Sequence, residues 1–306
     1  MNVTTGRVRV GDIELAYDAR GTGAPILLLP GFTMRRLMWP DAVCASLVAS
    51  GFHVVRMDNR DAGESTRFAA APPNVGTVLL RTMLGLAVQV PYRLEDMASD
   101  AFGLMSALGH ERFHVAGASM GGMIGQTMAI TRPERVRSLT SVMSSPGGRR
   151  YSFGKLAALK ALLAPMPSER DAKLTHMLGT LRLLHGDELP FDEQEARAIA
   201  LSQLEVDSPE AGARQLGAIF ESSMRRLDKL RVTTTPTLVI HGTEDPLLPM
   251  RGARAMAKLM PRAELLEVRG MGHAFPAPVL PTIADALTAL ARKADRTNGD
   301  ARTHGN

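Results

Sequence analysis

Short apolar runs of strand length alternate along this 306-residue chain with longer stretches of helical spacing. The expected strands are Ile26–Leu29, His53–Met57, Phe113–Ala116, Val136–Met143, Thr237–His241 and Glu264–Val268. The expected helices lie at about 39–50, 94–109, 120–132, 250–259 and 279–293. Apolar strands separated by amphipathic helices indicate an α/β fold with a mostly parallel central sheet, flanked by helices on both faces. A β-hairpin precedes this region, because 7–10 and 13–17 alternate in polarity around Gly11-Asp12.

The alternation of strands and helices stops between residues 145 and 230, where helical patterns continue without a convincing strand. We therefore expect 145–230 to be a helical cap, inserted between two strands of a core formed by 1–144 and 231–293. Residues 294–306 are polar and contain glycine, so we expect a flexible C-terminal tail.

The charge balance argues against a nucleic-acid partner. The chain has 36 basic and 31 acidic residues, a net charge of +5, and the basic residues form short pairs such as Arg149-Arg150. Scattered pairs are typical of solvated surfaces, whereas nucleic-acid binding needs a basic stripe or patch.

Cysteine usage and hydropathy indicate a cytoplasmic protein. Cys44 is the only cysteine, so neither a disulfide within the chain nor a thiolate metal cluster can form. The first seven residues lack the apolar core of a signal peptide, and the apolar stretch 78–90 is too short to span a bilayer. We expect no stable membrane insertion, and the sequence leaves a homodimer open.

One segment suggests a reaction. Gly117-Ala118-Ser119-Met120-Gly121 lies between an expected strand and an expected helix. On so tight a turn the serine backbone is strained, and the serine Oγ projects above the end of the sheet. Such a serine is a candidate nucleophile if the chain also supplies a base and an acid.

The base and the acid follow later strands in the expected order. A serine hydroxyl needs a base to attack a carbonyl, and the base needs an orienting carboxylate. Asp245 and His273 each come shortly after an expected strand, and such loops meet at the carboxyl edge of a parallel sheet. We therefore predict Ser119 as nucleophile, Asp245 as acid and His273 as base. Glu244 is the alternative acid, although the Asp-Pro turn places Asp245 at the bend of the loop.

Acyl transfer also needs two donors for the oxyanion. The backbone N–H of Met120 is one, because it follows the nucleophile at a helix N-terminus. The backbone N–H of Phe32 is the other, since Gly31 permits a sharp turn there and Pro30 has no N–H.

These motifs, with the stretch Asp-Asn-Arg-Asp-Ala-Gly-Glu-Ser at 58–65, resemble the α/β-hydrolase family over residues 7–292. Within that family the chain is most similar to aclacinomycin methylesterase-like carboxylesterases. It departs from many members, which have His-Gly where this chain has Pro30-Gly31. We expect the 58–65 stretch to be a structural polar turn near the acid loop.

The expected substrate is a small neutral ester. Apolar side chains are expected to form its pocket, namely Met34, Trp39, Leu247, Leu248 and Phe275. A serine carboxylesterase that works through an acyl-enzyme needs no metal or organic cofactor. The apolar cap favours short- to medium-chain acyl groups.

Other activities use the same three residues. A lactonase, a carbon–carbon bond hydrolase, an acyltransferase and a perhydrolase are the alternatives among enzymes. A ligand receptor without catalysis, built on the hydrolase fold, is the alternative from another class. Dehalogenase and epoxide hydrolase chemistry is disfavoured, because those relatives have an aspartate where this chain has Ser119.

Overall fold

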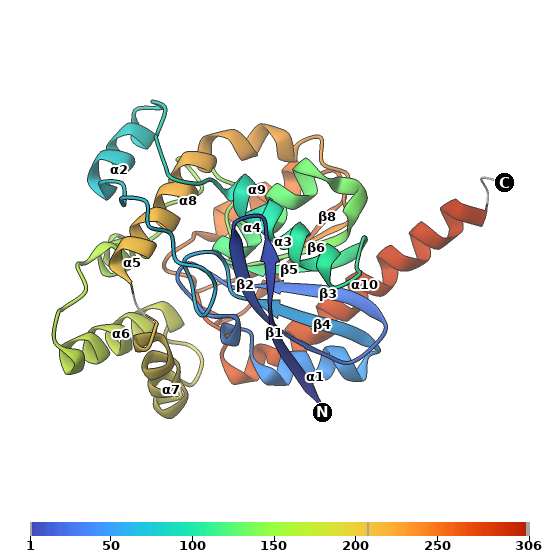
Figure 1. Cartoon of the computed structure of the whole chain (residues 1–306), viewed down its shortest axis with the longest axis horizontal. Coiled ribbons are helices and arrows are strands. Elements are labelled where there is room, and N and C mark those ends of the chain that lie inside the picture. Colours follow the sequence, from blue (N-terminus) through green and yellow to red (C-terminus); the bar gives the residue numbers. More distant parts are fainter. Residues whose placement is uncertain (1, 207, 304–306) are drawn as a thin grey trace.

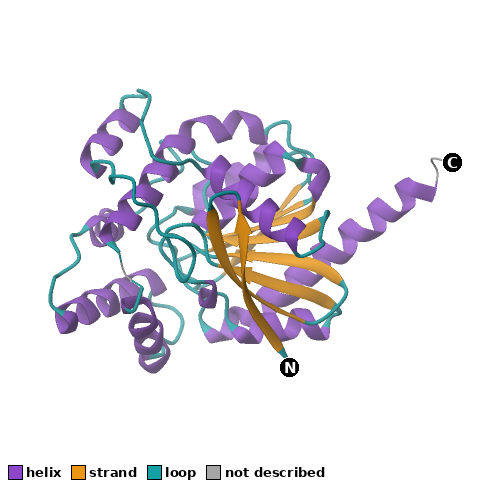
Figure 2. Cartoon of the chain, viewed as in Figure 1, coloured by secondary structure: helices purple, strands orange, loops and turns teal. Residues whose placement is uncertain are grey.

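A single eight-stranded sheet forms the centre of the computed structural model, which describes residues 2–206 and 208–303 (Figures 1 and 2). The strands are β1 (Val3–Val10), β2 (Ile13–Arg20), β3 (Ala24–Leu29), β4 (Phe52–Met57), β5 (Phe113–Ala118), β6 (Val136–Val142), β7 (Thr237–Gly242) and β8 (Ala263–Val268). Their order in the sheet is β1-β2-β4-β3-β5-β6-β7-β8. The hairpin β1–β2 and its junction with β4 are antiparallel, and every other pairing is parallel.

Helices cover both faces of the sheet. They are α1 (Asp41–Ala49), α2 (Val75–Met83), α3 (Leu94–Ala107), α4 (Met120–Thr131), α5 (Leu156–Leu163), α6 (Arg170–His185), α7 (Glu193–Leu204), α8 (Pro209–Leu230), α9 (Met250–Leu259) and α10 (Leu280–Thr303). Single 3₁₀ turns lie at Arg36–Met38, Pro133–Arg135 and Ala277–Val279.

The apolar runs of the strands divide between two cores. In β3, Leu27 and Leu29 belong to the core under α3 and α4, whereas Ile26 and Leu28 belong to the core under α1 and α10. Successive side chains of a strand point to opposite faces, so a continuous apolar run is needed where both faces are covered. The predicted α/β fold with a mostly parallel sheet is confirmed.

Helices α5 to α8 lie between β6 and β7 in the chain, where the sequence predicted only helices. Figure 1 shows α5, α6 and α7 on the side of the molecule opposite the end of α10. Helix α6 packs against α7, while α8 returns towards the sheet and packs against α2 and α4. The division into a core and a separate cap at 145–230 stays a prediction.

The expectation of a flexible tail at 294–306 is wrong for residues 294–303, which continue helix α10. Ala294 is buried, and the Asp295 carboxylate lies 3.0 Å from the Arg137 guanidinium on β6. Polar residues of fair helix propensity extend a helix when its inner face finds such contacts. Residues 304–306 lie outside the described residues.

No helix that the structure describes combines the length and the apolar character needed to cross a membrane.

The polar turn at 58–65 connects the sheet to α8. Both carboxylate oxygens of Asp61 accept from the Arg214 guanidinium on α8, at 2.8 and 3.0 Å. The Tyr92 hydroxyl and the Phe68 N–H also donate to Asp61, at 2.7 and 2.8 Å. The turn is structural as expected, but these hydrogen bonds anchor α8 rather than the loop that carries Asp245.

We predict that Arg214→Met lowers the free energy of unfolding by about 3–5 kcal/mol, because the buried Asp61 carboxylate loses its charged partner. Urea unfolding measures the change. The control is Arg254→Met, which removes an exposed pair with Glu267 and is expected to change stability far less than Arg214→Met. Equal effects of the two substitutions would contradict the anchoring role of Arg214.

Candidate active site

Ser119 lies on a sharp turn between β5 and α4. Its φ of 54° and ψ of −116° are strained for a residue with a side chain. The turn is tight because β5 and α4 nearly touch: a Cβ on Gly117 would lie 2.1 Å from the Gly121 carbonyl oxygen. A Cβ on Gly121 would lie 2.2 Å from the Leu29 carbonyl oxygen. Both positions therefore require glycine.

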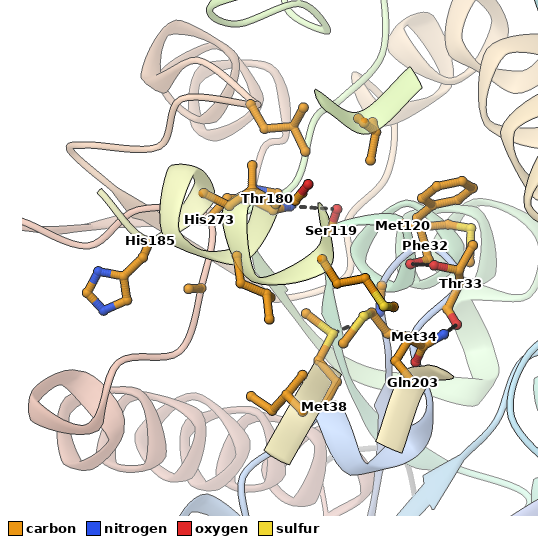
Figure 3. A pocket seen from close by; sticks show the side chains of 18 of the residues that line it. Phe32, Thr33, Met34, Met38, Ser119, Met120, Thr180, His185, Gln203 and His273 are labelled. Atoms are coloured by element: carbon orange, nitrogen blue, oxygen red, sulfur yellow. Dashed lines mark hydrogen bonds between the residues drawn. The ribbon is translucent and has the colours of Figure 1, made fainter. Parts of the chain in front are cut away.

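The structure brings the three predicted residues together. His273 Nε2 lies 3.0 Å from Ser119 Oγ (Figure 3). On the other side of the ring, His273 Nδ1 lies 2.8 Å from Asp245 Oδ2. With the imidazole proton on Nδ1, Nε2 is free to accept the serine proton. The alternative acid, Glu244, is half-buried, and its N–H donates to the Met271 carbonyl.

The side chain of Asp245 is buried and held as a carboxylate. The Leu247 and Leu248 N–H groups both donate to its Oδ1 at 2.8 Å. Burial by itself raises the pKa of the Asp245 carboxyl, but the nearby His273 and His241 and these donors outweigh it, so the pKa lies below its usual value. The carboxylate is therefore ionised at neutral pH and available to orient His273.

Two backbone N–H groups near Ser119 make no hydrogen bond. Among the described residues, neither the Phe32 N–H nor the Met120 N–H has a hydrogen-bond partner. In the view of Figure 3, Phe32 and Met120 lie on the opposite side of Ser119 from His273. The role of these two N–H groups as the oxyanion donors stays a prediction.

Two glutamines hold the loop that contains Phe32, and the sequence did not reveal them. The Thr33 N–H donates to Gln215 Oε1 at 2.7 Å, and Gln203 Nε2 donates to the Thr33 carbonyl at 2.8 Å. Gln215 also donates to the Arg60 carbonyl at 2.8 Å. Thr33 has a φ of 57°, so the loop keeps a strained conformation against two buried side chains. The two glutamines are 170 and 182 residues away from Thr33 in the sequence, and the residues around them do not indicate these contacts.

The histidine loop contacts α6, another of the helices between β6 and β7. The His273 N–H donates to the Leu184 carbonyl at 2.6 Å, near the end of α6. A Cβ on Gly272 would lie 2.2 Å from the His185 carbonyl oxygen, so the backbones of the loop and the helix end are in direct contact. Backbone groups from 145–230 thus take part in placing the histidine.

A cavity of about 1520 Å³ opens over Ser119 and His273. Met34, Leu247, Leu248 and Phe275 line it, as predicted. Trp39 does not, so that prediction is wrong. Its side chain is fully buried, its Nε1–H donates to the Leu29 carbonyl at 2.9 Å, and its ring packs on Phe275. The Trp39 indole therefore packs behind Phe275 and supports the cavity wall from outside the cavity.

Comparisons with known proteins show the family. Residues 24–276 match the model of the alpha/beta hydrolase fold family. Rhodomycin D methylesterase from Streptomyces sp. strain C5 is 31% identical, over 92% of this chain and 96% of its own. The enzyme of the same name from Streptomyces peucetius is 30% identical, over the same shares of the two chains.

Solved structures share the fold. A meta-cleavage product hydrolase from Pseudomonas fluorescens IP01 superposes with a TM-score of 0.74, at 18% identity, over 94% of this chain and 98% of its own. The matched family model covers most of the chain, and the Streptomyces relatives match along nearly their whole length. The chain therefore belongs to the α/β-hydrolase fold family and is a hydrolase of the esterase type.

Proposed function

We propose that this protein is a serine carboxylesterase in which Ser119 is the nucleophile, His273 the general base and acid, and Asp245 the orienting carboxylate. The observation that carries the proposal is the continuous hydrogen-bonded chain from Ser119 Oγ through the imidazole to Asp245, next to a large cavity. The methylesterase names of the two Streptomyces relatives support ester hydrolysis over the other reactions that use these three residues.

The proposed reaction has two steps. His273 Nε2 takes the proton of Ser119 Oγ as the oxygen attacks the ester carbonyl carbon. The Phe32 and Met120 N–H groups then stabilise the oxyanion, and His273 gives its proton to the departing alcohol. Water attacks the acyl-enzyme with the same base, which releases the acid and restores Ser119. No metal or organic cofactor takes part in either step.

The proposed substrate is a small, predominantly apolar ester. Methionine and leucine side chains supply much of the cavity wall, and unbranched methionines adapt to different shapes. The cavity volume of about 1520 Å³ exceeds the usual 300–1,000 Å³ of small-molecule sites. It therefore has room for a bulkier acyl or alcohol group than a short chain. Short- to medium-chain acyl preference stays a prediction.

Ser119→Ala is expected to lower ester hydrolysis at least about 10³-fold, because the substitution removes the nucleophile. The measurement is turnover of p-nitrophenyl esters from acetate to palmitate by the wild type and by the variant. We expect the wild-type rate to peak at short to medium chains. Equal rates for the two proteins would contradict the esterase proposal, and a peak at palmitate would contradict only the chain-length preference.

Asp245→Asn is expected to lower kcat by about 10³- to 10⁴-fold, because the amide no longer holds His273 in the required tautomer. The matched control is the adjacent Glu244→Gln, whose side chain makes no hydrogen bond to His273. Steady-state kinetics on p-nitrophenyl butyrate compare the two. A larger loss in the Glu244 variant would reverse the assignment of the acid.

The contacts of Gln215 suggest that it positions the proposed oxyanion donor. It accepts from the Thr33 N–H and donates to the Arg60 carbonyl, so the side chain joins the donor loop to the 58–65 turn. The side chain is fully buried, and losing it leaves two backbone groups without partners. A shift of the neighbouring Phe32 N–H would weaken binding of the oxyanion more than binding of the uncharged ester.

Gln215→Met is therefore expected to lower kcat about tenfold with KM changed less than about threefold. Affinity for a trifluoromethyl ketone, whose adduct with serine carries an oxyanion, should fall in parallel. The exposed Gln89→Met is the control and should change neither quantity. A rise in KM with unchanged kcat would contradict the positioning role.

A further inference from the structure

Two arginines line the cavity, and their surroundings differ. Arg56 lies 2.9 Å from the Asp18 carboxylate and 3.0 Å from that of Asp41. Arg226, near the end of α8, has no carboxylate within 4 Å among the described residues. No lysine lines the cavity in the described part of the chain. The charge of Arg226 is therefore the one cationic charge of the wall that lacks a carboxylate partner.

The hydrogen bonds of Arg226 leave part of its guanidinium unused. Nη1 donates to the Ser222 hydroxyl at 2.6 Å, and Nη2 makes a long contact of 3.4 Å with the Ser145 carbonyl. Nε is buried and has no hydrogen-bond partner, although a guanidinium carries five N–H donors. The residue is only 4% exposed, so bulk water does not satisfy these donors freely.

Arg226 is cationic at neutral pH despite its burial. Burial lowers its pKa to about 10, and the carboxylate of Glu95 opposes this from beyond ion-pair distance. A buried charge with only neutral hydrogen-bond partners is unfavourable, and a carboxylate that reaches it forms a charge-assisted pair. The folded protein thus contains an anion-accepting group that its own side chains leave unpaired.

Arg226 lines the cavity from α8. The cavity face of the helix repeats at helical spacing through Leu216, Phe220, Ser223 and Arg226. The wall therefore changes from apolar to polar along the helix. Contacts through two serines link Arg226 to the nucleophile residue. Arg226 contacts the Ser145 carbonyl, and the hydroxyl of the preceding Ser144 donates to the Ser119 carbonyl at 2.8 Å.

We propose that Arg226 is a carboxylate-binding subsite, and that the protein accepts esters that carry a second, free carboxylate group. This inference rests on the proposed ester hydrolysis for the reaction, and it replaces the neutral ester expected from the sequence with an ester that carries one negative charge. Arg226 binds the free carboxylate while Ser119 attacks the ester carbonyl. A carboxylate fits because it accepts two parallel bonds from a guanidinium, and its single charge suits a mostly apolar wall.

The test compares monomethyl and dimethyl esters of dicarboxylic acids, from glutarate to sebacate. The series varies the distance between the two carboxyl groups, and each pair differs only in the free carboxylate. We expect wild-type kcat/KM for the monomethyl ester to exceed that for the dimethyl ester at least tenfold at one or more lengths. A preference for the dimethyl ester at every length would overturn the proposal.

Variants test whether Arg226 causes the preference for the monomethyl ester. Arg226→Met should lower the ratio of monomethyl to dimethyl kcat/KM at least tenfold, and Arg226→Lys should retain part of it. The ratio is taken within one variant, so a loss of folded protein cancels. Arg225→Met, on the exposed side of the same helix, should keep the wild-type ratio. An unchanged ratio in Arg226→Met would overturn the assignment.

Measurements of ester binding test the carboxylate subsite independently of the proposed ester hydrolysis. Titration calorimetry of Ser119→Ala with the best monomethyl ester and its dimethyl partner needs no turnover. Tighter binding of the monomethyl ester, lost in Ser119→Ala/Arg226→Met, supports the subsite even if the wild type hydrolyses no ester. Equal binding of both esters by Ser119→Ala would overturn the subsite even if the wild type is an active esterase.

Discussion

The close crossing of β5 and α4 at Ser119 is the constraint on which the site depends. Because Gly117 and Gly121 lack side chains, the strand and the helix approach until backbone atoms touch, and the serine between them is held at a positive φ. The parallel strands β7 and β8 then end at the same edge of the sheet, where their loops present Asp245 and His273 to Ser119. The sheet edge thus brings the three residues together, and the end of α6 holds the histidine loop in place.

Much of this could be predicted from the sequence, because the signals are local. Apolar runs, glycine spacing and the residues directly after each strand are sufficient to place Ser119, Asp245 and His273. The failures have physical reasons. Trp39 is apolar and near the site in sequence, yet it packs behind the cavity wall. The polar residues after 293 continue a helix, because contacts with the sheet stabilise its inner face.

Contacts across long stretches of sequence could not be predicted. Gln203 and Gln215 look like ordinary polar residues of amphipathic helices, and only the folded structure shows that they hold the backbone of Thr33. Arg226 likewise resembles the other arginines of its helix until its burial and its lack of a carboxylate are known. In each case the informative property is the hydrogen-bond or ion-pair partner of the side chain, or the lack of one. The neighbouring residues in the sequence do not indicate either.

The hydrogen bond from the His273 N–H to the Leu184 carbonyl has a consequence for protein engineering. Families with a shared core are often recombined by exchanging inserted segments between members. A chimera of this protein would have to keep the end of α6, which accepts a hydrogen bond from the histidine loop. It would also need Gln203 and Gln215, whose side chains hydrogen-bond to the backbone of Thr33 in the loop after β3. A segment chosen for its binding surface alone would leave the loops that carry Thr33 and His273 without these hydrogen bonds.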